Sequence, residues 1–357
     1  MPWPLVADPG PGAPVGADRD AAPDSFGNVT AEYLALRRGC GLVAGRWEVV
    51  WVEGPGAVPF LQGLVSADVE GLSDRGVCRS FLLTPRGMVR FSLWVLKEGP
   101  RLGLVCDRGE GPALSETLEY YRIRVKAEVR LDPRPVSALV GPILPWTEVL
   151  GEDRWEPRGE DFRASAPLAG TPRAFFTGEA PGATRPVGEL AWRAVRVESG
   201  EPEVKRDLDD RTIPQETGEL ADAAISFDKG CYLGQELAAR IDSRGRVNRT
   251  LRGLEVRTNL LPPEGADVLK DEKKVGKITS VSESLELMAP VGLSLIRRGT
   301  DPGDEVRIRW EGGEAPARVR ALPMAPDSPR RILAALPDFG VPRAEILEDL
   351  KEGRSSR

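Results

Sequence analysis

Apolar and polar residues alternate with two different periods in the first part of the chain, which indicates both helices and strands. Residues 32–42 follow a helical period that should end near Gly39 or Gly41. Residues 47–53 alternate like a half-buried strand, and after a Gly-Pro-Gly break residues 57–64 predict a second short helix. The pattern therefore opens as helix, strand, helix.

Four further strands and one helix are expected before residue 135. The strands fall at residues 81–83, 89–96, 102–106 and 125–131, and the helix at residues 115–121. The turn Thr84-Pro85-Arg86-Gly87 joins the first two of these strands. Because strands and helices do not alternate strictly, the order favours an α+β fold over a doubly wound parallel sheet.

A second unit should begin near residue 135 and reach a helix at residues 235–241. Proline- and glycine-rich connections are expected at residues 157–172 and 179–186. Beyond residue 249 the spacing of turn residues is typical of a small β-barrel. Its strands are predicted at residues 251–256, 274–282, 291–296 and 305–310.

These patterns predict four regions. Residues 1–25 should be a disordered tail, residues 26–245 a two-part region with a boundary near 135, and residues 246–325 the barrel. Residues 326–357 should be a peripheral tail, in which residues 330–336 and 343–350 could form amphipathic helices.

Composition narrows the class of protein. The chain has 357 residues, 41% hydrophobic and 29% charged, which is enough for a sizeable core. It has no run of about eighteen apolar residues and no basic and apolar leader, so a cytoplasmic protein without membrane contact is expected. The net charge of -6 argues against direct nucleic-acid binding.

The chain contains no histidine, which removes the usual near-neutral general base and the imidazole ligands of most zinc sites. Its cysteines are Cys40, Cys78, Cys106 and Cys231, with no C-x-x-C pair, so no metal site is expected. The first three have mostly apolar or strand-like neighbours and are expected to be small buried hydrophobes.

Cys231 has a different context. It precedes a predicted helix start and lies two residues from Lys229, and both features favour the reactive thiolate. The alternative is an inert loop cysteine buried under Tyr232, and the residues alone leave both interpretations open.

The stretch around Cys231 resembles a known signature. Lys229-Gly230-Cys231-Tyr232-Leu233-Gly234-Gln235-Glu236 is similar to the motif of YgfZ-type proteins, a branch of the glycine-cleavage T-protein superfamily that includes the mitochondrial iron–sulfur maturation factor. Further similar segments lie at residues 60–69, 83–87, 212–216, 225–227, 244–249 and 275–280. The resemblance covers roughly residues 32–323. Ala67 and Asp242-Ser243 depart from the usual pattern.

The resemblance implies a T-protein-like multi-domain fold, with two mixed folate-binding subdomains and a C-terminal barrel. It implies tetrahydrofolate or a derivative as cofactor, and iron–sulfur client or assembly proteins as partners. The implied role is support of iron–sulfur cluster assembly or repair, and thereby of tRNA modification enzymes, with Cys231 and Lys229 as the functional motif.

Glu198 lies in residues 196–202, which resemble the segment in which T-proteins place a carboxylate against the pterin of tetrahydrofolate. A carboxylate can accept two parallel N–H donors of a pterin edge. The alternative is a surface carboxylate ending a strand. Among the arginines that follow the cysteine motif, Arg240 and Arg249 are expected to contact the anionic tail of folate, and the alternative is a solvated basic stretch.

Phe91 and Ser92 occupy the place where aminomethyl-transferring T-proteins carry an acidic pair. Without that acid, and without histidine, proton transfer at the folate nitrogen lacks an obvious agent. The resemblance therefore favours a binding protein. The alternatives are a folate-dependent aminomethyltransferase or other one-carbon transferase, and a module that binds RNA through the arginine run.

Overall fold

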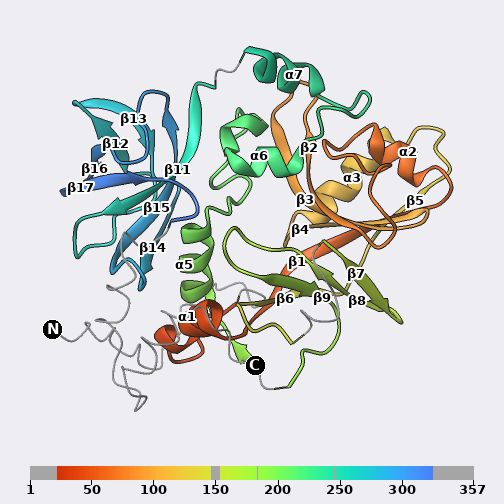
Figure 1. Cartoon of the computed structure of the whole chain (residues 1–357), viewed down its shortest axis with the longest axis horizontal. Coiled ribbons are helices and arrows are strands. Elements are labelled where there is room, and N and C mark those ends of the chain that lie inside the picture. Colours follow the sequence, from red (N-terminus) through yellow and green to blue (C-terminus); the bar gives the residue numbers. More distant parts are fainter. Residues whose placement is uncertain (1–21, 146–152, 183, 245–246, 325–357) are drawn as a thin grey trace, which may run out of the picture.

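A computed structural model describes residues 22–145, 153–182, 184–244 and 247–324, with the backbone alone for residues 240–244. Figure 1 shows a sheet-rich part, a separate barrel, and the helix α5 (Glu189–Ser199) between them. Within the described residues no helix is long and apolar enough to cross a membrane.

One ten-stranded sheet spans both predicted subdomains. Its central strand, β1 (Gly41–Glu53), pairs antiparallel with strands on both sides. The main order is β2-β3-β4-β1-β6-β9-β8-β7, and β5 and β10 also pair with β1. The other bounds are β2 Val77–Leu83, β3 Val89–Glu98, β4 Arg101–Asp107, β5 Glu128–Leu131, β6 Val136–Val140, β7 Trp155–Arg158, β8 Asp161–Ser165, β9 Arg173–Phe176 and β10 Arg185–Pro186. The sheet is thus continuous across residue 135.

Short helices cover the sheet and connect it to the barrel. Their bounds are α1 Val29–Arg38, α2 Ala57–Gln62, α3 Gly111–Tyr121, the 3-10 helix η1 Pro214–Thr217, α6 Glu219–Ala224 and α7 Gln235–Arg244. In α1, the Asn28 side chain accepts a hydrogen bond from the amide of Ala31, which caps the first turn. Helix α1 packs against α5, whose other side contacts β14 and β15 of the barrel.

The C-terminal strands form a seven-stranded antiparallel sheet with its own core, around Leu254, Val268 and Ile308. The strands are β11 Arg249–Val256, β12 Asp267–Lys270, β13 Lys273–Lys277, β14 Ser280–Ser284, β15 Ala289–Arg297, β16 Glu305–Trp310 and β17 Gly313–Arg320. The predicted α+β class with a terminal small barrel is confirmed.

Several local predictions were wrong. The expected connection at residues 157–172 contains β8 and the end of β7, and the single strand expected at residues 274–282 is divided between β13 and β14. The sequence pattern also missed β12 and β17. Glu198 does not end a strand, because residues 189–199 form α5. Every residue from Ala194 to Ser199 is buried, because α5 is covered on two sides.

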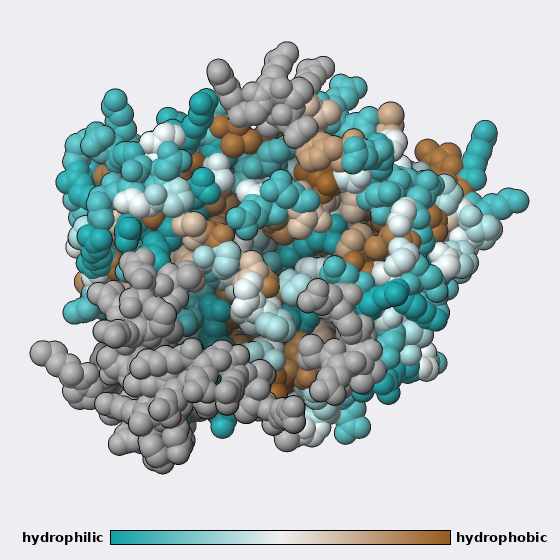
Figure 2. All heavy atoms as spheres, in the orientation of Figure 1, coloured by the Kyte–Doolittle hydropathy of each residue, from teal (hydrophilic) through white to brown (hydrophobic). Residues whose placement is uncertain are grey.

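The ends of the chain lie largely outside the described residues, including the helices predicted at 330–336 and 343–350. The carbonyl groups of Pro23 and Asp24 accept hydrogen bonds from the amides of Glu189 and Leu190, so residues 23–24 already pack on the start of α5. Figure 2 shows a mostly hydrophilic face with hydrophobic residues in small scattered groups.

Candidate functional site

The cysteine loop, residues 228–234, docks onto the first part of the chain. The ammonium group of Lys229 donates hydrogen bonds to the carbonyl oxygens of Val65 and Ala67, at 2.8 and 2.7 Å. Burial lowers the pKa of Lys229 to about 8, although Asp68 opposes that change. Lys229 therefore links the cysteine loop to residues 65–67, and its ammonium group points to their backbone carbonyl oxygens.

Two glycines allow the close approach of the loop to the turn at residues 84–87. Gly234 has φ +77°, and a Cβ there would overlap the carbonyl oxygen of Thr84. Gly87 has φ +84°, and a Cβ there would lie 2.7 Å from Cβ of Leu237 at the start of α7. Segments that carry the family resemblance, far apart in sequence, are thus in contact, and Figure 1 shows α7 beside the ends of β2 and β3.

Cys231 is exposed on this docked loop. The next side chain, Tyr232, is buried in a cluster with Phe81 and Leu83. The amide of Tyr232 donates to Oε1 of Gln235, the first residue of α7. The interpretation of Cys231 as buried under Tyr232 is therefore wrong, and the thiol is accessible on a fixed loop before a helix.

We expect alkylation of the folded protein at pH 8 to modify Cys231 at least tenfold faster than the other three cysteines. The rate depends on the fraction of thiolate and on how accessible the sulfur is to the reagent. Burial raises the pKa of Cys40, Cys78 and Cys106, with Cys78 at about 12. Timed iodoacetamide labelling with peptide mass spectrometry measures the four rates, and Cys231→Ser is the control. Comparable rates for all four thiols would contradict the assigned exposure.

A cavity of about 490 Å³, called here the outer cavity, lies where the sheet, α5, α6 and the barrel meet. This volume is in the range of ligand pockets. Its walls come from β2, the segment after β8, the end of α5, the start of α6 and two barrel segments. The lining includes residues 77–79, 167–169, 199–201, 217–220, 251–252 and 321–322.

A few polar groups face the outer cavity. Glu201 accepts a hydrogen bond from Nη1 of Arg79 at 2.8 Å, and Nη2 of Arg173 lies 3.7 Å away. Burial favours its neutral form, but these two guanidinium groups hold the pKa of Glu201 below its usual value. Nε of Arg252 and Oγ of Ser199 are buried and make no hydrogen bond with any described residue. The lining of the cavity thus includes the carboxylate of Glu201 and the cation of Arg252.

Glu198 lies elsewhere, in the contact between α5 and α1. Its carboxylate is 1% exposed and accepts hydrogen bonds from the Tyr33 hydroxyl at 2.8 Å and from Nε of Arg37 at 3.0 Å. It is absent from the walls of the outer cavity. A contact between Glu198 and a pterin stays a prediction, while Glu201, three residues further on, is the carboxylate of the same segment that lines the cavity.

The two predicted arginines also do not converge on the outer cavity. Arg249 pairs with Asp209 and Glu216, each at 2.9 Å, and these partners raise the pKa of its guanidinium. The backbone of Arg240 belongs to α7, and its side chain lies outside the described residues. Arg252, another arginine that follows the cysteine motif, lines the cavity, although the sequence did not single it out as a ligand contact.

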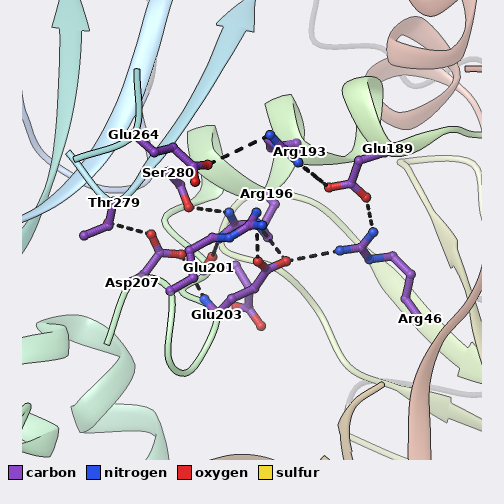
Figure 3. Close-up of polar contacts among 11 residues, drawn as sticks. Arg46, Glu189, Arg193, Arg196, Glu201, Glu203, Asp207, Glu264, Thr279 and Ser280 are labelled. Atoms are coloured by element: carbon purple, nitrogen blue, oxygen red, sulfur yellow. Dashed lines mark hydrogen bonds and ion pairs between the residues drawn. The ribbon is translucent and has the colours of Figure 1, made fainter. Parts of the chain in front are cut away.

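An ionic network fixes the parts that surround the cavity (Figure 3). Arg196 of α5 contacts Asp207 at 2.7 Å and donates to Oγ of Ser280 in the barrel at 2.6 Å. Asp207 in turn accepts from Oγ1 of Thr279, and Arg46 of β1 reaches Glu203 at 3.1 Å. The barrel, α5 and the large sheet are thereby held in one arrangement.

At the position of the missing acidic pair, Phe91 is buried in the core and Oγ of Ser92 accepts a hydrogen bond from Nη2 of Arg79 at 3.1 Å. Within the described part of the chain, no three His, Cys, Asp or Glu side chains are grouped so that they could hold a metal ion.

Comparisons with known proteins agree with this architecture. Residues 249–325 match the family described as the glycine cleavage T-protein C-terminal barrel domain. The structure is similar to an aminomethyltransferase T of the glycine cleavage system from Bartonella henselae, with a TM-score of 0.75 and 23% identity, covering 83% of this chain and 89% of that one.

Three relatives show the range of similar sequences. A tRNA-modifying protein YgfZ of Cronobacter sakazakii is 24% identical over 78% of this chain and 90% of its own length. An aminomethyltransferase of Caldanaerobacter subterraneus is 26% identical over 77% and 82%, respectively. A mitochondrial iron-sulfur cluster assembly factor IBA57 homolog of Pyricularia oryzae is 26% identical over 70% and 69%.

The continuous sheet, the bridging helix α5 and the C-terminal barrel define a protein with the T-protein fold. The docked cysteine loop carries the motif at residues 229–236, which the periodicity of apolar and polar residues did not explain. In sequence the chain is similar to YgfZ-type proteins, and its fold is similar to that of the glycine-cleavage T-proteins.

Proposed function

We propose that this protein binds tetrahydrofolate or a derivative in the outer cavity and supports iron–sulfur cluster assembly or repair, and thereby tRNA modification enzymes. The observation that carries the proposal is the cavity itself, whose volume of about 490 Å³ and mixed lining suit a drug-sized ligand with a flat polar ring and an anionic tail. The names of the YgfZ and iron-sulfur cluster assembly relatives support the second half of the proposal.

The lining residues have chemistry that suits the two ends of a folate. Glu201 and the indole ring of Trp94 lie on one side of the cavity, where a carboxylate can accept pterin N–H groups and a ring can stack. Arg252 lies on β11, and its guanidinium can pair with a carboxylate of the glutamate tail. These residues replace Glu198, Arg240 and Arg249 as the first candidates for ligand contact.

Helix α6 relates the cavity to the thiol. Glu219, Leu220 and Ala223 line the outer cavity, whereas Ala221 and Ala224 pack in the cluster that contains Tyr232. Helix α6 thus contacts both the outer cavity and the cluster that holds Tyr232, the residue next to Cys231. In this proposal the accessible Cys231 meets a client or assembly protein while folate occupies the cavity, and Lys229 holds the loop in place.

An aminomethyltransferase is the alternative function. It would need an acid beside the reacting folate nitrogen, and Ser92, hydrogen-bonded to Arg79, supplies none at the position that the family resemblance assigns. Turnover assays with a glycine-cleavage carrier protein distinguish the two functions, because the accessory protein should give none.

Titration of tetrahydrofolate under anaerobic conditions tests folate binding by calorimetry. We expect saturable heat with the unmodified protein and roughly tenfold weaker binding by Arg252→Met, because one charged hydrogen-bonded contact is lost. Arg257→Met is the matched control, since Arg257 is an exposed barrel arginine paired with Glu305. Absence of heat in the folded protein, or equal weakening by both variants, would refute the proposed site.

A further inference from the structure

The guanidinium group of Arg79 lies between the carboxylate of Glu201 and the hydroxyl group of Ser92. Both carboxylate oxygens of Glu201 lie 2.8 Å from Nη1 of Arg79, and Nη2 donates a hydrogen bond to Oγ of Ser92 at 3.1 Å. The Arg79 side chain is 7% exposed and that of Glu201 is 16% exposed. One buried cation thus connects a carboxylate in the wall of the outer cavity with the position at which aminomethyl-transferring T-proteins carry an acid.

The register of β2 and β3 brings Arg79 and Ser92 together. Arg79 lies opposite Trp94, and Phe81 lies opposite Ser92, in this antiparallel pair. Side chains of opposed residues, and of residues two positions further along, project from the same face of a sheet, so a long side chain reaches its diagonal neighbour. The Arg79 guanidinium also lies 5.1 Å from the centre of the Trp94 ring. The pairing of two strands therefore fixes where Arg79 lies.

Arg173 of β9 is a second cation near Glu201, but its contacts differ from those of Arg79. Its Nη2 lies 3.7 Å from Oε1 of Glu201, which is too far for a hydrogen bond, and its Nε donates to the carbonyl oxygen of Ala166 at 2.7 Å. Arg196 of α5 also lowers the pKa of Glu201 through its charge, after Arg79 and Arg173. Among the described residues, Arg79 is thus the cation that is hydrogen-bonded to this carboxylate.

Negative charge is already concentrated near Glu201. Burial, followed by the carboxylates of Glu203 and Glu201, raises the pKa of Asp107 to about 7, and Arg46 opposes that change. A further carboxylate at position 92 would have to share the guanidinium of Arg79 with Glu201, and like charges so close together favour protonation or displacement of one of them. The neutral hydroxyl group of Ser92 accepts its hydrogen bond without this competition.

We propose that Arg79 is a positioning residue that fixes the carboxylate of Glu201 in the wall of the outer cavity, and that the neutral side chain of Ser92 leaves Arg79 free for this task. Each carboxylate oxygen has a second lone pair for an N–H group of the ligand after it has accepted from Arg79. The absence of an acid at position 92 and the presence of an oriented carboxylate at position 201 are therefore linked. This inference rests on the proposed binding of folate in the outer cavity.

Ser92→Asp and Ser92→Asn are a matched pair of variants that tests the role of position 92. The two new side chains have the same shape and differ in charge, so both have the same steric effect. Calorimetric titration of tetrahydrofolate should give an affinity about tenfold lower for Ser92→Asp than for Ser92→Asn, because only the carboxylate competes with Glu201 for Arg79. Equal affinities of the two variants would overturn the role of Ser92.

A double-mutant cycle with Arg79→Met and Glu201→Gln tests whether Arg79 acts through Glu201. Each single variant should bind tetrahydrofolate about tenfold more weakly than the parent protein. The double variant should bind about as weakly as Glu201→Gln alone, because Arg79 then has no carboxylate to position. Losses that multiply to about a hundredfold would show that Arg79 contributes independently of Glu201, and would overturn the inference.

Urea unfolding of the same four proteins without ligand separates this inference from folate binding. The two substitutions should be less than additive in the parent protein and closer to additive in a Ser92→Asp background, where Arg79 is shared. If the parent protein gave no heat with tetrahydrofolate, the proposed function and the ligand role of Glu201 would fail, while the unfolding cycle would still show whether Arg79 and Glu201 act as a pair. Additive losses in the parent protein would overturn the pairing itself.

Discussion

Glu198→Ala is expected to lower the free energy of unfolding by roughly 3–5 kcal/mol, because it removes the buried carboxylate that accepts hydrogen bonds from both Arg37 and Tyr33. In the native protein the carboxylate accepts hydrogen bonds from Tyr33 and from Arg37, whose side chain is 16% exposed. Urea unfolding followed by circular dichroism measures the loss.

Glu286→Ala is the matched control for this prediction. Glu286 lies 3.7 Å from Nε of the same Arg37 but is 27% exposed, so its removal should cost less than about 1 kcal/mol. If Glu198→Ala kept full stability and lost tetrahydrofolate binding, the carboxylate would belong to the ligand site, and our assignment of Glu198 to the contact between α1 and α5 would be wrong.

Gly234→Ala is expected to detach the cysteine loop from the turn at residues 84–87. The backbone of Gly234 is in the left-handed region, and the added methyl group would overlap the carbonyl oxygen of Thr84. Strain and overlap together should cost roughly 2–4 kcal/mol. Amide hydrogen exchange of the peptide that contains Leu233, whose amide donates to the carbonyl of Gly63 at 3.0 Å, should rise sharply.

Gly230→Ala provides a control within the same loop. A Cβ at Gly230 would have no heavy atom within 4 Å, so this variant should keep the exchange protection and stability of the parent protein. Equal exchange in the two variants would show that the loop is not held by the close approach at Gly234.

The two sites have different physical characters, and this has a consequence for experiments on them. Cys231 is exposed on a loop held by two hydrogen bonds of Lys229 and one of the Leu233 amide. The outer cavity, by contrast, is built from a sheet, two helices and a barrel. Loss of thiol reactivity and loss of ligand binding are therefore separable, and only variants that change α6 or the docking of Tyr232 should affect both.

The local pattern determined much of the fold. The turn at residues 84–87, the strands on either side of it and the helix after the cysteine loop follow from turn chemistry and short-range periodicity. The barrel also followed from sequence, because short alternating strands separated by Pro, Gly and Asp turns restrict the possible structures. The signature around Cys231 was sufficient to indicate the family and the accessible thiol as the residue of interest.

Only the tertiary structure decided which charged residues face a cavity. Glu198 is paired with Arg37, 161 residues earlier in the chain, and Arg249 is paired with Asp209 and Glu216, whereas Glu201 and Arg252 line the outer cavity. Near neighbours in sequence therefore have opposite roles. The reason is physical. Contacts between distant segments decide whether a charged group is paired in the core or lines a cavity, and no local sequence pattern specifies those contacts.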